Sequence, residues 1–585
     1  MLDGAPDGRV HRRFRAASRE EAASQARKAA VRLAAVGLQP VAQRWDEKAR
    51  ALIVMYAPQR DVRSGSRPRA PRQAAVVGLA LILVVGGLAA VALSQPSPGG
   101  PATGPSASVR PTPVPIAERY TGPIPHFEPT ECRTEWLLGR QTDCGDLIVA
   151  ENRSRPDGRR ISLHVAIQRT YSPRAAPDPV VYLDGGPGAS PLLDGFWTDP
   201  FLEDRDLIVF DQRGVGLSQP SLDCPEVLFL LIRDELDTMS ACRLRLAQGG
   251  ADLGAYHSAA SAADLDDLRL ALGYEQWNLY GISYGSRLAL TAMRDHPDGI
   301  RSVILDSVYP PQRDIYAEGA RNAQRAFDNL FSACLDDPDC GEAFPDLEER
   351  FYGVVARLDE RPRNVGGILG LGGTTVDGSM LINLLFNRLY MTDFLGEIPG
   401  ALDNFWNEEW DELEFWLVDL VGFGRPAGPW SVSEGQHFSV QCAEELPFTD
   451  SRLLLRDEPS VRWPVTLAFE WQPTIDICAM WDVPAADAVE NLPVVSSIPT
   501  LLLAGTYDPI TPPAWASDTA ATLSSGQVLV VPGVGHGVLG TSFCVDDLVR
   551  QFLAAPSQAV QAGCLGGLRE PEFLLPDAED PLLGD

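Results

Sequence analysis

One short stretch constrains the fold of this chain more than any other. In residues 278–286, NLYGISYGS, glycines stand two positions before and two positions after Ser283. The run WNLY before the serine is typical of a short strand, and SRLALTAMRDH after it is typical of a helix. Glycine leaves space where a Cβ atom would collide with the neighbouring strand or helix. We therefore expect a tight strand-to-helix turn that holds Ser283 in a strained backbone conformation.

The sequence on either side of this turn continues the same alternation of strands and helices. The segment SAADLDDLRLALG is an amphipathic helix that we expect to end at Gly273. Further strands are predicted at PVVYLD (179–184), DLIVFD (206–211), RSVILDSV (301–308), IPTLLLAG (498–505) and GQVLVVPG (526–533). Short apolar runs separated by helices are typical of buried parallel strands. The sequence thus predicts an α/β fold, with a mostly parallel sheet and helices on both faces.

The alternation is interrupted once. Between residues 311 and 490 helical patterns dominate, and 7 of the 12 tryptophans fall there. The simplest interpretation is an α/β core in two parts, 117–310 and 491–585, with an inserted helical cap at 311–490. The preceding segment 94–116 is rich in Pro, Gly and Ser, which is typical of a flexible linker.

Before the linker, residues 74–93 form a run of 20 uncharged, apolar residues. A helix of this length crosses about 30 Å of hydrocarbon, so we predict a transmembrane helix. A buried core helix or the core of a signal peptide is the alternative, although a signal core is shorter and nearer the start. Five arginines lie between residues 60 and 72, and the next charge after the run is Arg110. This asymmetry predicts a single-pass membrane protein. Its N-terminus would lie in the cytoplasm, and the chain after residue 93 would lie outside.

The charge of the chain divides at the same place. Residues 1–73 carry a balance of +9 and the remainder −39. Strand-like patterns at 9–16 and 51–57, with a capping box at Ser18 and Glu21 before a helix ending near Gly37, predict a small basic α/β unit in the cytoplasm. Its basic residues either form a solvated surface or contact anionic lipid. The acidic remainder argues against nucleic acid as a partner.

The cysteines agree with an external location. All ten lie after the apolar run. An even number confined to one side is typical of disulfides in an oxidising compartment, and neighbour pairing would close short loops. We expect the pairs 132–144, 224–242, 334–340, 442–478 and 544–564. No Cys-x-x-Cys pair is present, which argues against zinc.

Ser283 has suitable partners for nucleophilic catalysis. A serine hydroxyl needs a base that is held by an acid, and with a nucleophile at such a turn the acid and then the histidine follow along the chain. Asp508 follows the strand in LLLAGTYDPITP, and His536 follows the next strand in VVPGVGHGV. No other histidine lies after His437. We predict the catalytic triad Ser283, Asp508 and His536.

An oxyanion hole is predicted beside the serine. In YLDGGPGAS, Gly185 and Gly186 follow a strand, where backbone without side chains can approach a substrate carbonyl. A simple Gly-Pro turn is the alternative. We expect the N–H groups of Gly186 and Tyr284 to form the hole, aided by the positive end of the helix that begins after Ser283.

Five motifs in order now resemble a known family. DGGPGAS, DLIVFDQRGVGLS, NLYGISYGS, GTYDPITP and PGVGHG are together similar to the proline iminopeptidase and tripeptidyl aminopeptidase group of α/β-hydrolases, over residues 117–585. The resemblance implies cleavage of residues or short peptides from free N-termini, and a helical cap whose acidic residues bind the N-terminal ammonium. Asp184 stands where many iminopeptidases have His, and the several cysteines resemble the secreted tripeptidyl branch.

Together these features predict a membrane-anchored, extracytoplasmic serine hydrolase that acts through an acyl-enzyme without metal or cofactor. Its expected partners are peptides with a free N-terminus and, through residues 74–93, the lipid bilayer. Glu444 and Glu445 in SVQCAEELPF are the candidates for binding the ammonium group, unless both are solvated surface carboxylates. The alternatives for the whole protein are a carboxylic ester hydrolase and a non-catalytic surface protein that binds a ligand.

Overall fold

The structure is a computed structural model, and its chain divides into two compact units, Met1–Arg110 and Pro111–Asp585. In the first unit it describes four strands. In the second it describes residues 120–575 apart from 135–140, 195–198, 230–233, 366–373, 414–415, 418–431 and 451–457. The predicted helix after Ser18, the predicted span 74–93 and the predicted linker 94–116 lie outside the described residues. Along the described part of the chain, no helix has both the length and the hydropathy needed to cross a membrane.

The first unit contains an antiparallel sheet in the order β1-β2-β4-β3. Its strands are β1 (Asp3–Gly4), β2 (Val10–Arg15), β3 (Leu38–Asp46) and β4 (Ala51–Pro58). Two of them, β2 and β4, lie where the sequence predicts strands. We did not predict β3. It contains Pro40, and proline cannot donate to a ladder. The strand tolerates this proline because it lies at the edge of the sheet, and its register shifts between Pro40 and Ala42.

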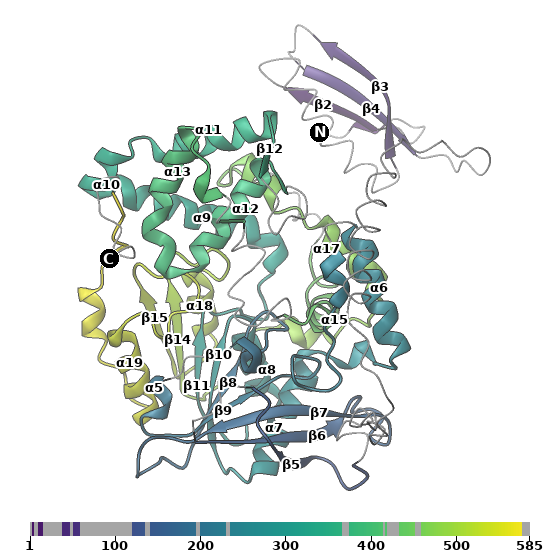
Figure 1. Ribbon diagram of the computed structural model, residues 1–585, viewed down its shortest axis with the longest axis vertical. Coiled ribbons are helices and arrows are strands. Elements are labelled where there is room, and N and C mark those ends of the chain that lie inside the picture. Colours follow the sequence, from purple (N-terminus) through teal and green to yellow (C-terminus); the bar gives the residue numbers. More distant parts are fainter. Residues whose placement is uncertain are drawn as a thin grey trace, which may run out of the picture. The chain divides into compact units, whose positions relative to one another are not determined.

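The second unit is built on a nine-stranded sheet in the order β15-β14-β11-β10-β8-β9-β7-β6-β5 (Figure 1). The first six strands in this order are parallel, and β7, β6 and β5 continue the sheet in antiparallel pairs. The mostly parallel sheet is as predicted, whereas the antiparallel end was not. The strands are β5 (His126–Thr130), β6 (Thr142–Ala150), β7 (Arg160–Gln168), β8 (Val180–Leu183), β9 (Leu207–Phe210), β10 (Trp277–Ile282), β11 (Ile300–Asp306), β14 (Thr500–Gly505) and β15 (Gly526–Val531).

Alternating side chains of the strands form two hydrophobic clusters, one on each face of the sheet. Along β8, Val181 and Leu183 belong to one cluster, and Val180 and Tyr182 belong to the other. This period of two is the geometry of a strand buried on both faces. The apolar runs of the sequence therefore do not alternate with polar residues, because neither face of these central strands meets water.

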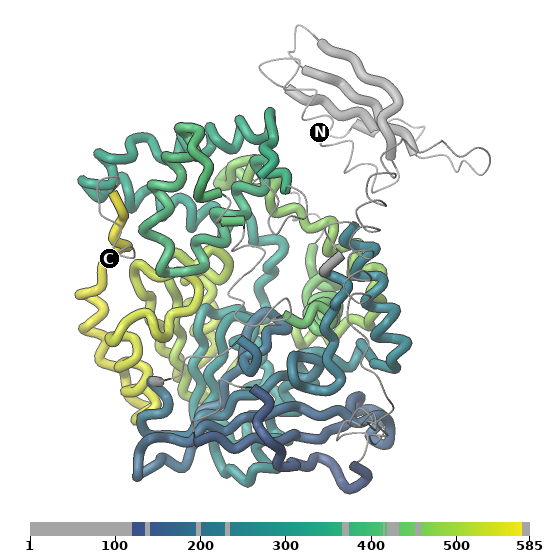
Figure 2. The backbone as a smooth tube through the Cα atoms, in the orientation of Figure 1, coloured from purple at the N-terminus to yellow at the C-terminus, as the bar shows by residue number. Residues whose placement is uncertain are grey.

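Helices cover both faces. The first cluster includes side chains of α7 (Ser258–Leu272), α8 (Tyr284–Asp295) and α18 (Pro513–Ala520). The second includes side chains of α5 (Asp199–Leu202) and α19 (Phe543–Ala554), which lie side by side although they are far apart in the sequence (Figure 2). As predicted, α7 ends before Gly273, which caps it at φ 78°.

Between the paired strands β11 and β14 the chain forms a helical insertion. Its elements are α9 (Ile315–Asp336), α10 (Pro338–Ala343), α11 (Leu347–Glu360), β12 (Arg363–Val365), β13 (Thr374–Val376), α12 (Gly378–Tyr390), η5 (Thr392–Glu397), α13 (Ile398–Trp406), α15 (Glu434–Glu444), α16 (Trp463–Ala468), α17 (Gln472–Trp481) and η6 (Ala488–Asn491). Helices α9 to α13 and α16 share one apolar core.

Two further helices among the described residues of the insertion pack elsewhere. Helices α15 and α17 form a separate apolar core with α6 (Glu235–Gln248), which precedes β10 (Figure 1). The sequence did not indicate α6 as part of this layer. Short helices elsewhere in the described part of the second unit are α4 (Pro191–Asp194), η2 (Pro225–Phe229), η3 (Leu253–Ala255) and η7 (Ala562–Gly567).

All ten cysteines are paired. The disulfides are Cys132–Cys144, Cys224–Cys242, Cys334–Cys340, Cys442–Cys478 and Cys544–Cys564. Each joins sequence neighbours among the cysteines, as predicted.

Candidate active site

Ser283 lies between the end of β10 and the start of α8. Its backbone has φ 55° and ψ −126°, a conformation that costs a non-glycine residue free energy. A Cβ atom on Gly281 would lie 2.3 Å from the carbonyl oxygen of Gly285, and one on Gly285 would lie 1.9 Å from that of Leu183. The strained turn and the steric need for both glycines are therefore as expected from the sequence. Such a turn presents the serine hydroxyl away from the sheet.

Asp508 and His536 lie on the loops that follow β14 and β15. The Nδ1 atom of His536 is 2.9 Å from Oδ2 of Asp508. The Asp508 carboxylate is fully buried, and it accepts hydrogen bonds from the amides of Ile510 and Thr511 and, at 2.6 Å, from the Thr511 hydroxyl. Burial alone would raise the pKa of Asp508, but the attraction of His536 and hydrogen bonds from His536 and Thr511 lower it below its ordinary value. An ionised Asp508 that accepts from Nδ1–H leaves Nε2 of His536 free to take a proton.

Thr511 was not recognised from the sequence as part of this group. Its hydroxyl oxygen lies 3.2 Å from Nδ1 of His536 as well as next to Asp508. The short spacing in DPIT was the only signal, because a hydroxyl three residues after an aspartate can return to its carboxylate.

Asp306, at the end of β11, connects the serine turn to the histidine loop. Its carbonyl oxygen accepts the amide of Ser283 at 2.9 Å. Its buried carboxylate accepts the amides of Val538 and Leu539 at 2.8 and 2.9 Å and the hydroxyl of Tyr280 at 2.8 Å. Burial raises the pKa of Asp306, although these hydrogen bonds act in the opposite direction. The sequence shows only an aspartate at a strand end, which does not reveal this function.

The histidine loop also contacts the residues beside Ser283. The amide of Gly537 donates to the Ser307 hydroxyl at 2.8 Å, and a Cβ atom on Gly537 would lie 3.2 Å from the Ile282 side chain. The residue after His536 is thus next to the residue before Ser283. Within the described part of the chain, no hydrogen bond joins the Ser283 hydroxyl to His536. In enzymes without substrate such catalytic hydrogen bonds are often long.

The glycine loop after β8 approaches the serine closely. A Cβ atom on Gly185 would lie 3.0 Å from Cβ and 3.5 Å from Oγ of Ser283. Gly186 has φ 105°, which favours glycine. Neither the amide of Gly186 nor that of Tyr284 donates to any acceptor among the described residues. Two unsatisfied amides beside a nucleophile are what an oxyanion hole requires.

Asp184 holds the base of this loop. Its Oδ1 atom accepts the amide of Gly185 at 2.7 Å and the Tyr182 hydroxyl at 3.1 Å. Burial raises the pKa of Asp184, against the effect of these two hydrogen bonds. The amide of Gly185 is therefore occupied and is not available to an oxyanion.

Glu444 and Glu445 are buried at the end of α15, with exposed fractions of 0% and 4%. The alternative that they are solvated surface carboxylates is therefore wrong. Glu444 accepts the amide and the hydroxyl of Ser258 at 2.5 and 2.7 Å, and the Ser258 hydroxyl lies 2.8 Å from that of Tyr284. Glu445 forms an ion pair of 2.6 Å with Arg287, which is 1% exposed.

These side chains form a buried charged cluster between the start of α7, the first turn of α8 and the end of α15. The Nε atom of Arg287 also lies 3.6 Å from Glu444, so one guanidinium faces two carboxylates. Burial raises the pKa of Glu445 to about 7 despite the attraction of Arg287. The sequence identified both glutamates but neither Arg287 nor Ser258, which come from segments more than 150 residues earlier in the chain.

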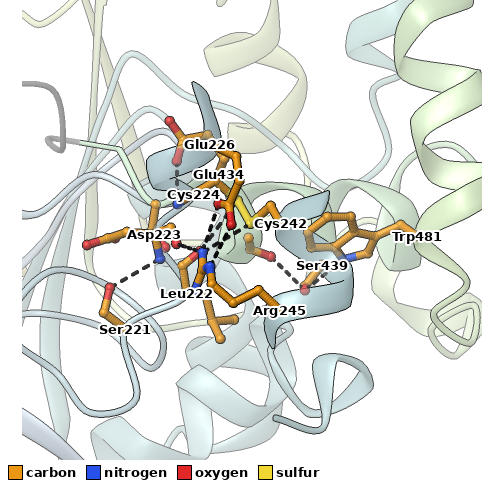
Figure 3. The surroundings of a disulfide bond; sticks show 12 residues. Ser221, Leu222, Asp223, Cys224, Glu226, Cys242, Arg245, Glu434, Ser439 and Trp481 are labelled. Carbon is orange, nitrogen blue, oxygen red and sulfur yellow. Dashed lines mark hydrogen bonds and ion pairs between the residues drawn. A yellow bond between two sulfur atoms is a disulfide. The ribbon is translucent and has the colours of Figure 1, made fainter. Parts of the chain in front are cut away.

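Among the described residues, one group of three side chains has the spacing of a metal site. It consists of Cys224, Glu226 and Cys242. Figure 3 shows that the two sulfurs are joined to each other and that Glu226 lies near Arg245, whose Nε donates to it at 2.7 Å. Sulfur in a disulfide is not a thiolate, so this group is structural. The amide of Cys224 donates to Glu434 at 3.1 Å, which attaches the disulfide to the start of α15 (Figure 3).

Two family models match the chain. The model of the alpha/beta hydrolase fold matches residues 178–361, which include the Ser283 turn. The model of TAP-like proteins matches residues 466–563, which include Asp508 and His536. The two matches extend into the helical insertion from either end, and they include the glycine loop, the Ser283 turn and the loops of Asp508 and His536.

The chain is also similar to relatives that bear three different names. Serine protease Hip1 of Mycobacterium tuberculosis is 27% identical over 451 residues, covering 70% of this chain and 84% of that protein. The tripeptidyl aminopeptidase of Streptomyces lividans is 24% identical over 469 residues, covering 72% and 83%. A probable proline iminopeptidase of Streptomyces coelicolor is 31% identical over 175 residues, covering 30% and 41%. The chain is therefore a serine hydrolase of the α/β-hydrolase superfamily, with the similarity to the proline iminopeptidase and tripeptidyl aminopeptidase group that its motifs predict.

Proposed function

We propose that the protein is a serine aminopeptidase that removes residues or short peptides from free N-termini. The observation that carries this proposal is the strained Ser283 turn beside two unsatisfied amides and an Asp508–His536 pair. The relatives named tripeptidyl aminopeptidase and proline iminopeptidase support the class of substrate.

The proposed mechanism has two steps. Ser283 attacks the scissile carbonyl carbon while His536 takes the hydroxyl proton, and Asp508 stabilises the imidazolium. The oxyanion accepts hydrogen bonds from the amides of Gly186 and Tyr284. His536 gives the proton to the leaving amine, the acyl-enzyme forms, and water releases the acyl product with His536 again acting as base.

The selection of a free N-terminus is assigned to the buried cluster at the end of α15. When ionised, Glu444, Glu445 and Arg287 together carry one net negative charge, which attracts an ammonium group. Both oxygens of Glu444 are already occupied by Ser258, so Glu445 is the residue that meets the ammonium. An approaching cation keeps Glu445 ionised although its pKa in the free protein is raised to about 7.

The catalytic unit is placed outside the cytoplasm, anchored by residues 74–93. The arginines before this run and the five disulfides after it support this arrangement. Carbonate extraction of membranes tests it. The full chain should stay in the pellet, and a variant without residues 74–93 should not. Release of the full chain by carbonate would contradict the proposal that residues 74–93 anchor it.

A panel of substrates tests the activity. Aminoacyl, dipeptidyl and tripeptidyl amides, each free or N-acetylated, are compared with simple acyl esters on the wild type, Glu444→Gln and Glu445→Gln. Among the amides, we expect cleavage of the free ones only. On these amides Glu445→Gln should lose about 10- to 1000-fold in kcat/KM, while its turnover of the simple acyl esters should change little. Turnover of esters alone would instead support an ester hydrolase. If no substrate of the panel is cleaved, the result would support a protein that only binds a ligand. If both glutamine variants stay within about twofold of wild type on free peptides, the ammonium site lies elsewhere.

A further inference from the structure

The loop that carries Asp508 is fixed from two sides. On one side, Thr511 and the amide of Ile510 hold the carboxylate. On the other side, two main-chain carbonyl groups of the loop, those of Thr506 and Asp508, accept hydrogen bonds from the helical insertion. The donors are side chains of α9, and no other group of the described residues donates to either carbonyl.

Arg325 is the central donor. Its Nη1 atom donates to the carbonyl oxygen of Thr506 at 2.7 Å, and its Nη2 atom donates to that of Asp508. Asn329, one turn later on the same face of α9, donates to Thr506 at 2.9 Å. Arginine suits this position because its planar guanidinium presents several donors in a fixed arrangement, whereas lysine has one compact charge.

The guanidinium of Arg325 loses part of its hydration in this position. Burial lowers the pKa of Arg325, although the nearby Asp508 acts in the opposite direction. Its Nε atom is buried without a hydrogen-bond partner among the described residues. Both Nη atoms of the partly desolvated Arg325 donate to the loop of Asp508. This arrangement suits a residue that fixes the loop better than one that forms a surface ion pair.

Two other parts of the site are attached to the insertion in the same way. The amide of His536 donates to the carbonyl oxygen of Tyr390, the last residue of α12, at 2.9 Å. In the glycine loop, the carbonyl oxygen of Gly188 accepts the amide of Ser433 at 2.8 Å, and that of Pro187 lies 3.2 Å from Nδ1 of His437. The acid loop, the histidine loop and the glycine loop therefore each have a partner in the insertion.

We infer that Arg325 is a positioning residue, which places Asp508 through the backbone of its loop and makes the helical insertion part of the framework of the active site. This inference rests on the proposed role of Asp508 in the triad. A shift of a catalytic group by about 1 Å can reduce a rate about 100-fold, so the contact has a kinetic consequence. Arg325 does not touch substrate in this scheme, and its loss should change kcat rather than KM.

The experiment compares Arg325→Ala and Arg325→Lys with Arg321→Met. Arg321 is the matched control, because it lies one turn earlier on α9 but pairs with Glu458 at 3.1 Å on the surface. We measure kcat and KM on the best amide of the substrate panel, the rate of labelling by a fluorophosphonate, and the thermal midpoint. Arg325→Ala should lose about 10- to 100-fold in kcat with KM within about twofold, and Arg325→Lys should lose less. Arg321→Met should behave as wild type.

Added guanidinium ion at low, non-denaturing concentration should restore part of the kcat of Arg325→Ala but not that of Asp508→Asn. A purely structural role would not give this rescue. Wild-type kcat in both Arg325 variants overturns the inference, as does a loss that guanidinium does not reverse. If Arg325→Ala does not fold, Arg325→Lys is the deciding variant. A kcat of Arg325→Lys equal to that of wild type then overturns the inference. Full activity in Asp508→Asn would instead show that the proposed triad is wrong.

Discussion

The main-chain amide of Ser283 donates to the carbonyl oxygen of Asp306, whose carboxylate accepts the amides of Val538 and Leu539. One residue at the end of β11 thereby fixes the nucleophile turn and the loop of His536. The two loops are separated by about 250 residues of sequence, which include the whole insertion. Asp306 can do this because β11 lies between β10 and β14 in the sheet.

Replacement of the nucleophile gives the first prediction. Ser283→Ala should leave a folded protein whose activity is lower by several orders of magnitude, because the neighbouring hydroxyls are engaged elsewhere. The Ser286 hydroxyl donates to the carbonyl oxygen of Ser283, and the Tyr284 hydroxyl lies 2.8 Å from that of Ser258. The variant should also lose labelling by a fluorophosphonate probe. Labelling that persists in this variant would mean that another serine is the nucleophile.

The second prediction concerns Thr511. Its hydroxyl donates to Asp508 at 2.6 Å, so Thr511→Val removes a hydrogen bond to a buried carboxylate. We expect kcat/KM to fall by about 10- to 100-fold, the scale of a lost hydrogen bond to a charged group. Thr511→Ser retains the hydroxyl and serves as the control, with activity close to wild type. Equal activity of the Val and Ser variants would show that the hydroxyl is not needed.

The third prediction tests the steric demand at the turn. A Cβ atom on Gly285 would lie 1.9 Å from the carbonyl oxygen of Leu183 and 2.9 Å from that of Asp184, so the backbone of β8 must move. Gly285→Ala should destabilise the protein by about 3 kcal/mol or more. Gly566→Ala is the control, because nothing lies within 4 Å of its Cβ position, and it should change stability by less than about 0.5 kcal/mol. Thermal unfolding of the two variants compares them, and similar midpoints would contradict the steric argument.

The disulfides give the fourth prediction. Cys442–Cys478 closes a separation of 36 residues, and Cys334–Cys340 closes one of 6. The entropy lost by the unfolded chain grows with the closed loop, so replacing both cysteines by serine should cost about 4 kcal/mol for the first pair and about 2 kcal/mol for the second. Mass mapping of non-reduced peptides checks the pairing, and denaturant unfolding checks the order of the two costs. Crossed links or a large pool of free thiols would reject the pairs.

The fifth prediction is a dependence of stability on pH that comes from Glu445. Its pKa rises from an ordinary 4.5 to about 7 on folding, so the folded protein binds this proton more tightly than the unfolded chain does. The resulting stabilisation is fully present below pH 4.5 and is lost as the pH rises through 7. Glu445→Gln cannot titrate at this position and should lack this component. Relative to the variant, the wild type should therefore lose a few kcal/mol between about pH 5 and pH 8.

Thermal midpoints of wild type and Glu445→Gln across this pH range measure the effect. A constant difference between the two proteins at every pH would show that Glu445 does not change its protonation on folding. The comparison uses the difference between two proteins, so the titration of all other carboxylates cancels in so far as they do not couple to Glu445.

The sequence alone determined the features that depend on residues close together in the chain. The turn at Ser283 follows from two glycines between a strand pattern and a helix pattern, and Gly273 ends α7 where expected. The pairing of Asp508 with His536 could be predicted because each follows an apolar strand and their order matches that of a serine hydrolase. Alternation of side chains and steric exclusion act over a few residues, so a linear pattern records them.

The tertiary structure alone decided which distant residues meet. Asp306 and Val538 are 232 residues apart, Arg325 and Asp508 are 183 apart, and Glu444 and Ser258 are 186 apart. No local pattern encodes these contacts, because a hydrogen bond depends on distance in space and the sheet brings these segments together. Burial changed the interpretation of Glu444 and Glu445 for the same reason. A glutamate on the surface and one facing Arg287 have the same sequence pattern, and only the packing of α15 under α8 distinguishes them.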